Sequence, residues 1–355
     1  MSLRALGWCP FFEEAFAPFS KDGLTAARVA VQHRGGYEVW TASEVLPAEV
    51  SGRFRHQAPH ASDYPAVGDW VAFESIAGES RAVIHAVLPR RTKFSRNAAG
   101  KATEEQVLAS NIDEVFIVES LAVPPNLRRL ERFLTLAWES GARPTVVLTK
   151  ADLCKDVRAA VNAASTLTKG AAVLAISCIA DQGVAAIKKR LRKGRTVALL
   201  GPSGAGKSTL INYLVGEESQ HVLPVREVDQ KGRHTTTSRE MVFLSGGGVL
   251  IDTPGLRELQ LWEGGEGLES AFADIEEMST RCRFTDCQHE KEPGGAVRQA
   301  VQEGMLTESR LAGFHKLRGE VAQFAPRREE RVRADTSKHA KGVTRSLRGQ
   351  RFEED

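Results

Sequence analysis

The sequence has few of the features that mark secreted and membrane proteins. Only five of its 355 residues are cysteines, too few and odd in number for a disulfide framework, so a reducing compartment is favoured. No stretch approaches the roughly 18 uninterrupted apolar residues that a membrane-spanning helix requires. The opening residues, MSLRALGWCPFFEEAF, include acidic side chains where a secretory signal would be apolar. These absences predict a cytoplasmic protein with no membrane partner.

An excess of charge of either sign is also lacking. Lys and Arg number 48 and Asp and Glu 45, so any contact with nucleic acid must come from local clustering. An apolar content of 42% is typical of a globular protein with a substantial core. At roughly 100 to 200 residues per domain, the length predicts two or three domains. No internal repeat or heptad pattern is present, and we expect a monomer.

The N-terminal region, residues 1–106, is rich in short β-type runs. Between about residues 26 and 96 these runs are ARVAVQHRG, YEVWTA, VSGRFRH, VGDWVAFES and SRAVIHAVLP, and they predict a small antiparallel barrel of the OB-like kind. Such barrels bind oligonucleotides or act as structural adaptors, and the pattern favours neither. A basic stretch follows, which either faces phosphates or is a solvated linker. Its cations are Arg90, Arg91, Lys93, Arg96 and Lys101.

Residues 107–269 alternate apolar strands with helical segments, the pattern of parallel βαβ units. The expected strands are VFIVES, PTVVLT, VLAIS and TVALLG, and the expected helices are LRRLERFLTLAWES, VAAIKKRLRKG and one from about Lys207. Two further strands, REMVFLS and GVLIDTPG, are joined by three glycines that predict a hairpin. This region is therefore expected to be an α/β domain.

Residues 270–325 are predicted to be helical, with a Cys/His loop. Apolar side chains repeat at spacings of three and four near the end, which predicts an amphipathic helix packed on the domain body. They are Leu311, Phe314, Leu317, Val321 and Phe324. The tail, residues 326–355, has nine Lys or Arg, six Asp or Glu and almost no apolar residue, and it is predicted to be disordered when free. Its cations suit RNA contact, whereas the interleaved acids suit a solvated tail.

A phosphate-binding pattern stands between a predicted strand and a predicted helix. Residues 201–208, GPSGAGKS, satisfy G-x-x-x-x-G-K-[ST]. Glycines let backbone N–H groups turn toward phosphates, and the helix N-terminus adds its positive dipole end. Lys207 can then reach the β- and γ-phosphates, while the Ser208 hydroxyl can ligate Mg²⁺. The predicted nucleotide contacts are Gly201, Pro202, Ser203, Gly204, Ala205, Gly206, Lys207, Ser208 and Thr209.

A second segment suits the metal and the γ-phosphate. Asp252 ends the apolar strand VLI, so its carboxylate can hold magnesium through water, and the Gly255 amide is then free to sense the γ-phosphate. An Asp and a Gly in a loop otherwise mean only a turn. The stretch GRHTTT, residues 232–237, lies between the two segments, and the hydroxyls of Thr235 and Thr236 are candidate magnesium ligands.

The segment Thr149-Lys150-Ala151-Asp152 follows the strand PTVVL and suits a guanine base. A carboxylate at Asp152 can accept two parallel hydrogen bonds from N1–H and the exocyclic amine of guanine, whereas adenine offers no such pair. Discrimination of this kind reaches ~10⁴ or more. The Lys150 stem can cover the base while its ammonium stays in water. Ser177-Cys178, after the strand VLAI, can add a backbone contact to the guanine carbonyl.

These motifs resemble those of the circularly permuted GTPases, because the guanine motifs come before the phosphate and magnesium motifs in the chain. With the barrel, the GRHTTT, ESLAV and ERFL segments and the later Cys and His residues, the chain is similar to the ribosome-small-subunit-dependent GTPase A (RsgA) family along nearly its whole length. The resemblance implies a multidomain protein: an OB-like barrel, a permuted α/β P-loop GTPase domain and a helical Cys/His domain. It also implies GTP hydrolysis, slow alone and stimulated by the small ribosomal subunit, in late assembly of that subunit, with the subunit and its rRNA as partners.

Two positions depart from the usual patterns. The base motif starts with Thr149 instead of Asn, which keeps a hydroxyl but loses an amide that would brace the loop. In the family's zinc site a fourth ligand follows three that this chain retains, but its place is taken by Gly295. The retained residues are Cys282, Cys287 and His289. Either zinc is held, with Glu290 or Glu292 or a water as the fourth ligand, or the metal has been lost and the three are ordinary side chains.

Catalysis is expected to rest on Lys207, Ser208, Thr236, Asp252, Gly255 and His234. Leu256 stands where Ras-like enzymes have the glutamine that orients the attacking water, and leucine cannot do so. His234 is the candidate replacement, or the ribosome supplies this function and His234 is simply exposed. Lys207 and Mg²⁺ are expected to neutralise the transition-state charge. Two alternatives stay open: a P-loop ATPase or small-molecule kinase with no role for Asp152, and an RNA-binding module without turnover.

Overall fold

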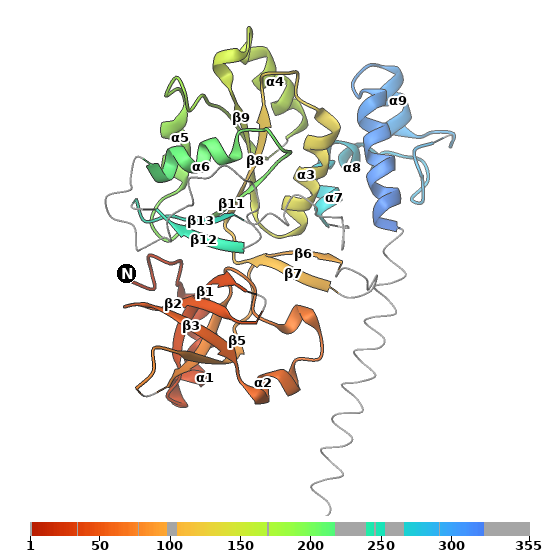
Figure 1. Cartoon of the computed structure of the whole chain (residues 1–355). Coiled ribbons are helices and arrows are strands. Elements are labelled where there is room, and N and C mark those ends of the chain that lie inside the picture. The colour runs from red at the N-terminus through yellow and green to blue at the C-terminus, as the bar shows by residue number, and fades with distance from the viewer. Residues whose placement is uncertain are drawn as a thin grey trace, which may run out of the picture.

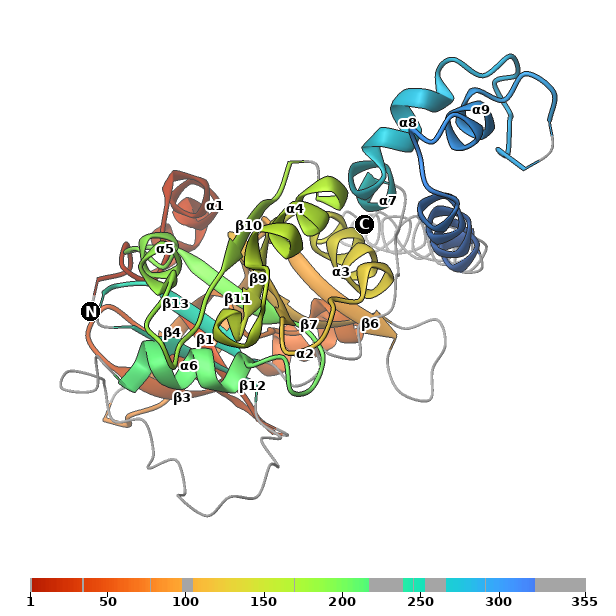
Figure 2. The ribbon, with the colours of Figure 1, turned by 90° about the horizontal axis from the view of Figure 1, so that it is seen from above.

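The protein consists of a barrel, an α/β domain beside it and a group of helices at one side of the α/β domain (Figures 1 and 2). The computed structural model describes residues 2–33, 35–76, 78–97, 105–168, 170–216, 239–244, 246–252, 266–290 and 292–322. None of the helices within these ranges has the length and apolar character that crossing a bilayer requires.

The N-terminal barrel is closed. Its strands are β1 (Thr25–Gln32), β2 (Tyr37–Trp40), β3 (Val45–Val50), β4 (Trp70–Ser75) and β5 (Ala82–Val87). They follow the order β1-β2-β3-β5-β4, and β4 pairs again with β1, so the sheet returns on itself. Alternate side chains fill the interior, among them Val29, Val39 and Phe73. The predicted OB-like barrel is confirmed.

One expected strand is a helix. VSGRFRH was predicted to be extended, but β3 ends at Val50 and helix α2 (Gly52–Gln57) follows. Ser51 starts the helix, because its hydroxyl accepts a hydrogen bond from the Phe54 amide at 3.0 Å. The helix buries Phe54 while its basic side chains stay exposed. That prediction was wrong because a capping serine outweighed a weak β pattern.

Aromatic packing holds a helix that the sequence patterns did not indicate, α1 (Pro10–Lys21), against the barrel. The Trp8 ring meets Trp70 edge-on with centroids 4.7 Å apart, and Phe12 lies 5.8 Å from the same ring. Trp70 is fully buried at the start of β4. The short 3₁₀ helix η1 (Ala61–Asp63) lies between α2 and β4.

Two cations of the basic stretch are structural. Arg90 pairs with the buried Asp69 at 2.9 and 2.7 Å and donates to the backbone carbonyls of Ser62 and Tyr64. Lys93 pairs with Glu105 at 2.9 Å across the hairpin of β6 (Lys93–Asn97) and β7 (Glu105–Ser110). These two side chains are therefore engaged in ion pairs within the protein, although Lys93 is still 37% exposed. Lys101 lies outside the described residues.

The α/β domain has the parallel sheet that was predicted. Its strands are β8 (Glu114–Ser120), β9 (Arg143–Thr149), β10 (Ala172–Ala175), β11 (Thr196–Leu200) and β13 (Val249–Asp252), in the order β10-β9-β8-β11-β13. Strand β12 (Arg239–Phe243) runs antiparallel to β13 on one side and pairs with β1 of the barrel on the other. The barrel and the α/β sheet thus form one continuous hydrogen-bonded sheet.

Helices cover both faces of the α/β sheet (Figure 2). One face packs on α3 (Leu127–Glu139) and α4 (Val157–Leu167), and the other on α5 (Val184–Arg190) and α6 (Lys207–Gly216). Successive residues of β8 divide between the two cores, since Ile117 belongs to the first and Phe116 to the second. This is the doubly wound arrangement, which presents its loops at the strand ends.

A buried arginine joins the barrel to the α/β domain. Arg28 of β1 donates to the Thr196 hydroxyl at 2.7 Å and to the carbonyls of Leu6, Gly68 and Asn111. Burial lowers the pKa of Arg28 to about 10. Because Thr196 begins β11, the strand before the phosphate loop, this cation fixes the barrel against the central strand of the sheet.

The C-terminal helices are attached to the α/β domain through α3, which α7 and the last helix contact. They are α7 (Glu266–Ala271), α8 (Ala273–Ser279), α9 (Ala296–Gln302) and a last helix over residues 308–322. The approach of α7 is close, because a Cβ on Gly267 would come 2.6 Å from the Thr135 carbonyl. The predicted amphipathic helix is present: Leu311, Phe314 and Leu317 are buried. Phe324 lies outside the described residues.

Candidate nucleotide site and Cys/His cluster

The predicted nucleotide segments meet at one edge of the sheet. Residues 201–206 follow β11, Thr149 ends β9, Ser177 follows β10 and Asp252 ends β13. Since these strands are parallel, their carboxyl ends share an edge, the place where doubly wound sheets bind ligands.

The phosphate loop wraps around the Lys207 ammonium. Gly201 has φ +150°, and a Cβ there would lie 2.2 Å from the Val118 carbonyl, so the turn after β11 needs glycine. Lys207 is 6% exposed, and its Nζ donates to the carbonyls of Gly201 at 2.8 Å and Pro202 at 2.6 Å. Helix α6 begins at Lys207, which places its N-terminus under the loop. Ser208 and Thr209 are exposed beside it.

The base loop is bonded directly to the phosphate loop. The Thr149 hydroxyl donates to the Ala205 carbonyl at 2.5 Å, and a Cβ on Gly206 would lie 3.1 Å from that hydroxyl. Thr149 thus braces the loop with its hydroxyl, although it lacks the amide of asparagine. The Lys150 ammonium lies at an exposed position and also donates to the Gly204 carbonyl at 3.0 Å. Sequence reasoning missed these backbone acceptors, since no residue type marks them.

The end of β10 supports the base loop from the other side. The Ala151 amide donates to the Ile176 carbonyl at 3.0 Å. Ser177 is buried and pairs with Gln182 through two backbone hydrogen bonds of 2.9 Å. Burial raises the pKa of the Cys178 thiol. The backbone amide of Cys178, the predicted contact to guanine, has no hydrogen bond to a described residue. The exposed Asp152 carboxylate lies in the adjacent turn η2 (Ala151–Leu153).

Asp252 is half-buried at the end of β13, next to the strand that carries the phosphate loop. Glu240 stands opposite it on β12, and burial together with the Asp252 charge raises the pKa of Glu240. His234, Thr235, Thr236, Gly255 and Leu256 lie outside the described residues.

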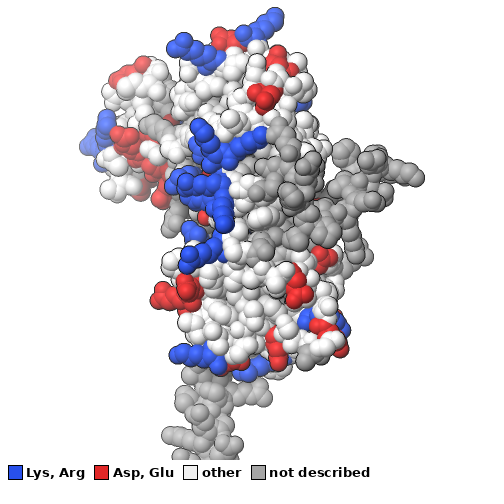
Figure 3. Space-filling view, turned by 90° about the vertical axis from the view of Figure 1, so that its left-hand side faces the viewer, with Lys and Arg blue, Asp and Glu red and all other residues white. Residues whose placement is uncertain are grey.

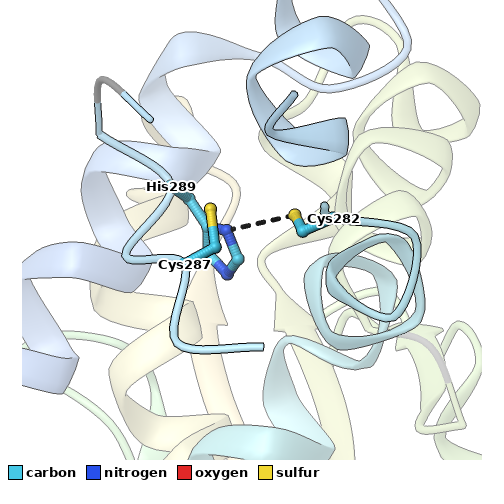
Figure 4. A group of neighbouring side chains, drawn as sticks. All are labelled: Cys282, Cys287 and His289. Atoms are coloured by element: carbon cyan, nitrogen blue, oxygen red, sulfur yellow. Dashed lines mark hydrogen bonds between the residues drawn. The ribbon is translucent and has the colours of Figure 1, made fainter. Parts of the chain in front are cut away.

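The Cys/His cluster lies apart from the nucleotide loops, among the C-terminal helices (Figure 4). The Cys282 Sγ and His289 Nδ1 are 3.7 Å apart, and the donor atoms of Cys282, Cys287 and His289 all lie within 4.8 Å of one another. Tetrahedral zinc would separate a sulfur and a nitrogen ligand by roughly 3.6 Å, so the donor set fits the metal.

The position of the missing fourth ligand faces the same cluster. A Cβ on Gly295 would lie 3.7 Å from the Cys287 Sγ. The suggested substitute Glu292 is used within the loop, because its two oxygens accept hydrogen bonds of 2.9 Å from the amides of Gln288 and Glu290. The loop therefore supplies three side-chain donors, and glycine at position 295 supplies no donor at the fourth ligand position.

A parallel sheet with a phosphate loop after its central strand, and a guanine-type loop that comes earlier in the chain, defines a circularly permuted P-loop GTPase. Comparison with known proteins gives the family. Residues 87–262 match the RsgA GTPase family model. The chain belongs to this family, and it is a GTP hydrolase that uses a guanine nucleotide and Mg²⁺.

The relatives match over nearly the whole chain. The small ribosomal subunit biogenesis GTPase RsgA of Opitutus terrae is 46% identical over 343 residues, which cover 94% of this chain and 93% of the relative. The protein of that name from Streptomyces coelicolor is 44% identical, with coverage of 96% and 92%. The crystal structure of YjeQ from Thermotoga maritima superposes with a TM-score of 0.64 at 25% identity, covering 84% of this chain and 99% of that one. YloQ, a circularly permuted GTPase, gives 0.61 at 25% identity, with coverage of 84% and 96%.

Proposed function

We propose that this GTPase acts in late maturation of the small ribosomal subunit, with that subunit and its rRNA as partners. The observation that carries the proposal is the 2.5 Å bond between the Thr149 hydroxyl and the Ala205 carbonyl, which joins a base loop and a phosphate loop into one site. That site occurs in a chain whose relatives, matched almost end to end, are named for biogenesis of this subunit. We also expect a monomer in the cytoplasm.

The site residues have separate roles in nucleotide binding and in hydrolysis. Asp152 accepts the guanine N–H groups, the Cys178 amide contacts the guanine carbonyl, and the amides of residues 201–209 surround the phosphates. Lys207 exchanges its loop carbonyls for phosphate oxygens and balances the charge that develops on them. The hydroxyls of Ser208, Thr235 and Thr236 and the Asp252 carboxylate would hold Mg²⁺, which neutralises phosphate charge when bound. Gly255 contacts the γ-phosphate.

Phosphate release from GTP, with and without purified small subunits, tests the proposal. We expect slow release alone and a large stimulation by small subunits, with large subunits at equal concentration as the control. Equal rates in all three samples would contradict the ribosomal role. A preference for fluorescently labelled ADP over labelled GDP would contradict the guanine site and favour the ATPase alternative.

His234→Ala is expected to lower the stimulated rate by ~10²-fold, the usual contribution of a positioned proton-transfer or water-orienting group. GDP affinity should remain near that of the wild type, because the base and phosphate loops are unchanged. Stopped-flow phosphate release with small subunits measures the first quantity and a GDP titration the second. An unchanged stimulated rate would rule out His234 as the residue that orients water.

We further propose that the Cys/His cluster holds zinc through Cys282, Cys287 and His289, with water as a fourth ligand. Two observations support this proposal: the three donor atoms all lie within 4.8 Å of one another, and two thiols with an imidazole form a donor set that zinc prefers. When bound, zinc would cross-link the loop to the end of α8. Elemental analysis of chelator-washed protein should find about one zinc per chain, and a clearly sub-stoichiometric content would contradict this proposal.

Gly295→Cys is expected to raise zinc affinity by about 100-fold or more, because a third thiolate, as the fourth ligand, closes the tetrahedral site. The new side chain fits: Gly295 has φ −76°, and the atoms nearest to an added Cβ lie at 3.4 and 3.7 Å. Competition with a chromophoric chelator measures the affinity. Gly295→Ser is the matched control, since it adds similar volume without a thiolate. Equal affinities of the two variants would show that position 295 does not reach the metal.

A further inference from the structure

Cations gather at the edge of the α/β sheet opposite the nucleotide loops. They line a cleft of about 440 Å³ whose lining includes two carboxylates, Asp113 and Glu114. The six cations are Arg91, Arg143, Lys189, Arg190, Arg192 and Arg195. Figure 3 shows Lys and Arg side chains gathered at the middle of the side of the molecule that carries α5. We call this set the basic cleft.

The topology of the sheet creates the basic cleft. Helix α5 ends in three cations, and the short segment after it leads into β11 at Thr196. Arg143 is the first residue of β9, and Glu114 is the first residue of β8. The amino ends of these parallel strands therefore meet here, and the nucleotide loops lie at their carboxyl ends. Five residues of β11 separate the two edges by roughly 17 Å, so both can be occupied at once.

The carboxylates of the cleft are already engaged. Asp113 accepts from the Thr196 amide at 2.9 Å and pairs with Arg195 at 3.4 Å and Arg91 at 3.6 Å. Glu114 pairs with Arg190 at 2.6 Å.

Three cations of the cleft are left over from these pairs. Arg143, Lys189 and Arg192 are exposed and form no ion pair with any residue in the described part of the chain. Positive charge therefore exceeds negative charge, and the surplus donors face solvent.

We propose that the basic cleft binds the phosphate backbone of RNA. Five of its six cations are arginines, whose planar forks match phosphate oxygens in bidentate geometry. A concave site with spaced guanidinium groups suits a chain of phosphates, whereas a lipid surface is bound by cations beside exposed apolar side chains. The half-buried Trp138 also lines the cleft, and aromatic side chains in such grooves stack on unpaired bases. This inference rests on the proposed ribosomal function, in which the RNA is small-subunit rRNA.

A triple variant tests the basic cleft: Arg143→Gln, Lys189→Gln and Arg192→Gln. None of the three forms an ion pair with a described residue, so the fold should be kept. Filter binding of the full chain to an in-vitro transcript of small-subunit rRNA is measured at several salt concentrations. Affinity should fall at least ~10-fold, and the slope of log K against log salt should flatten by roughly 2 to 3, about one unit for each cation that no longer neutralises a phosphate. GDP affinity should not change, because the nucleotide loops lie at the other edge.

The matched control removes three exposed cations elsewhere: Lys21→Gln, Arg158→Gln and Lys316→Gln. Its rRNA affinity should stay within twofold of the wild type. Equal affinities of the two triple variants would overturn the proposal. So would a cleft variant that loses binding to phosphatidylglycerol vesicles while its rRNA affinity is intact, since that result would assign the cleft to lipid.

Different results would contradict the ribosomal function and the proposal for the basic cleft. A wild-type protein without stimulation by small subunits, together with a fall in rRNA affinity specific to the cleft variant, would contradict the function and keep the cleft. A stimulated wild type with an unaffected cleft variant would contradict the cleft alone.

Discussion

Asp152→Asn is expected to change the preferred base from guanine to xanthine. The carboxylate of Asp152 accepts from two N–H donors of guanine, whereas an asparagine side chain offers one acceptor and one donor. Its donor would oppose the exocyclic amine of guanine but would pair with the carbonyl that xanthine has at that position. Since an unpaired buried donor is costly and carboxylate hydrogen bonds are strong, GDP affinity should fall by ~10³-fold and XDP affinity should rise. Titrations with labelled GDP and XDP measure both.

Asp156→Asn is the matched control for this substitution. Asp156 is an exposed carboxylate four residues further on, and it caps α4 by accepting from the Ala159 amide at 2.9 Å. Asparagine caps helices equally well, so this variant removes the same charge without changing the fold. It should bind GDP like the wild type. If Asp152→Asn also bound GDP within fivefold of the wild type and did not bind XDP, the base would not be recognised at Asp152.

The convergence of the two nucleotide loops could be predicted from the sequence, because it follows from topology. VFIVES, PTVVLT and TVALLG are apolar on both faces, as strands covered by helices on both sides must be. Parallel strands bring their following loops to one edge, and residues near 150 and 205 are indeed joined there by the Thr149–Ala205 bond. The hydrogen bonds that connect the two loops could not be predicted, since their acceptors are backbone carbonyls, which no residue type marks.

Long-range hydrogen bonds and ion pairs of buried arginines could not be predicted from the sequence, for a different reason. Arg28, Arg90 and Arg310 look like ordinary surface cations, and their partners are distant in the chain. Arg28 bonds to Thr196 and Arg310 pairs with Glu131, 168 and 179 residues away. Only the folded arrangement of the barrel, sheet and C-terminal helices brings these groups together. Similarly, the helical prediction for VAAIKKRLRKG gave no sign that its cations would meet Arg143 in one cleft.

Arg310→Met is expected to weaken the attachment of the C-terminal helices by about 3 to 5 kcal/mol. The Arg310 guanidinium, 5% exposed, donates to Glu131 of α3 at 2.9 Å and to Asp274 of α8 at 2.8 Å. It also donates to the Ala271 carbonyl at 2.7 Å and lies 4.1 Å from the centroid of the Phe272 ring. Removing it leaves two carboxylates, 4% and 15% exposed, without a cation. Native-state hydrogen exchange of amides in residues 308–322 measures the destabilisation.

Arg298→Met is the matched control in the same group of helices. Arg298 pairs with Glu308 at 3.0 Å, but the Glu308 side chain is 70% exposed, so the variant should cost less than about 1 kcal/mol. Similar destabilisation in the two variants would contradict the special role of the buried pair.

The pH dependence of the Arg310→Met effect separates the charge pairing of Arg310 from its packing. In the wild type, burial is the largest influence on the pKa of Asp274 and would raise it. The hydrogen bonds to Arg310, the Arg310 charge and backbone hydrogen bonds together outweigh burial and lower that pKa, whereas the pKa of Glu131 is raised by burial despite Arg310. The Asp274 contribution to stability is thus present above its unfolded pKa and is lost as pH falls through the lowered folded value. Without Arg310, burial raises the pKa of both carboxylates, and a raised folded pKa favours the folded state as pH falls. The stability difference between wild type and variant should therefore narrow from pH 7 to pH 5, and a constant difference would attribute the effect to packing alone.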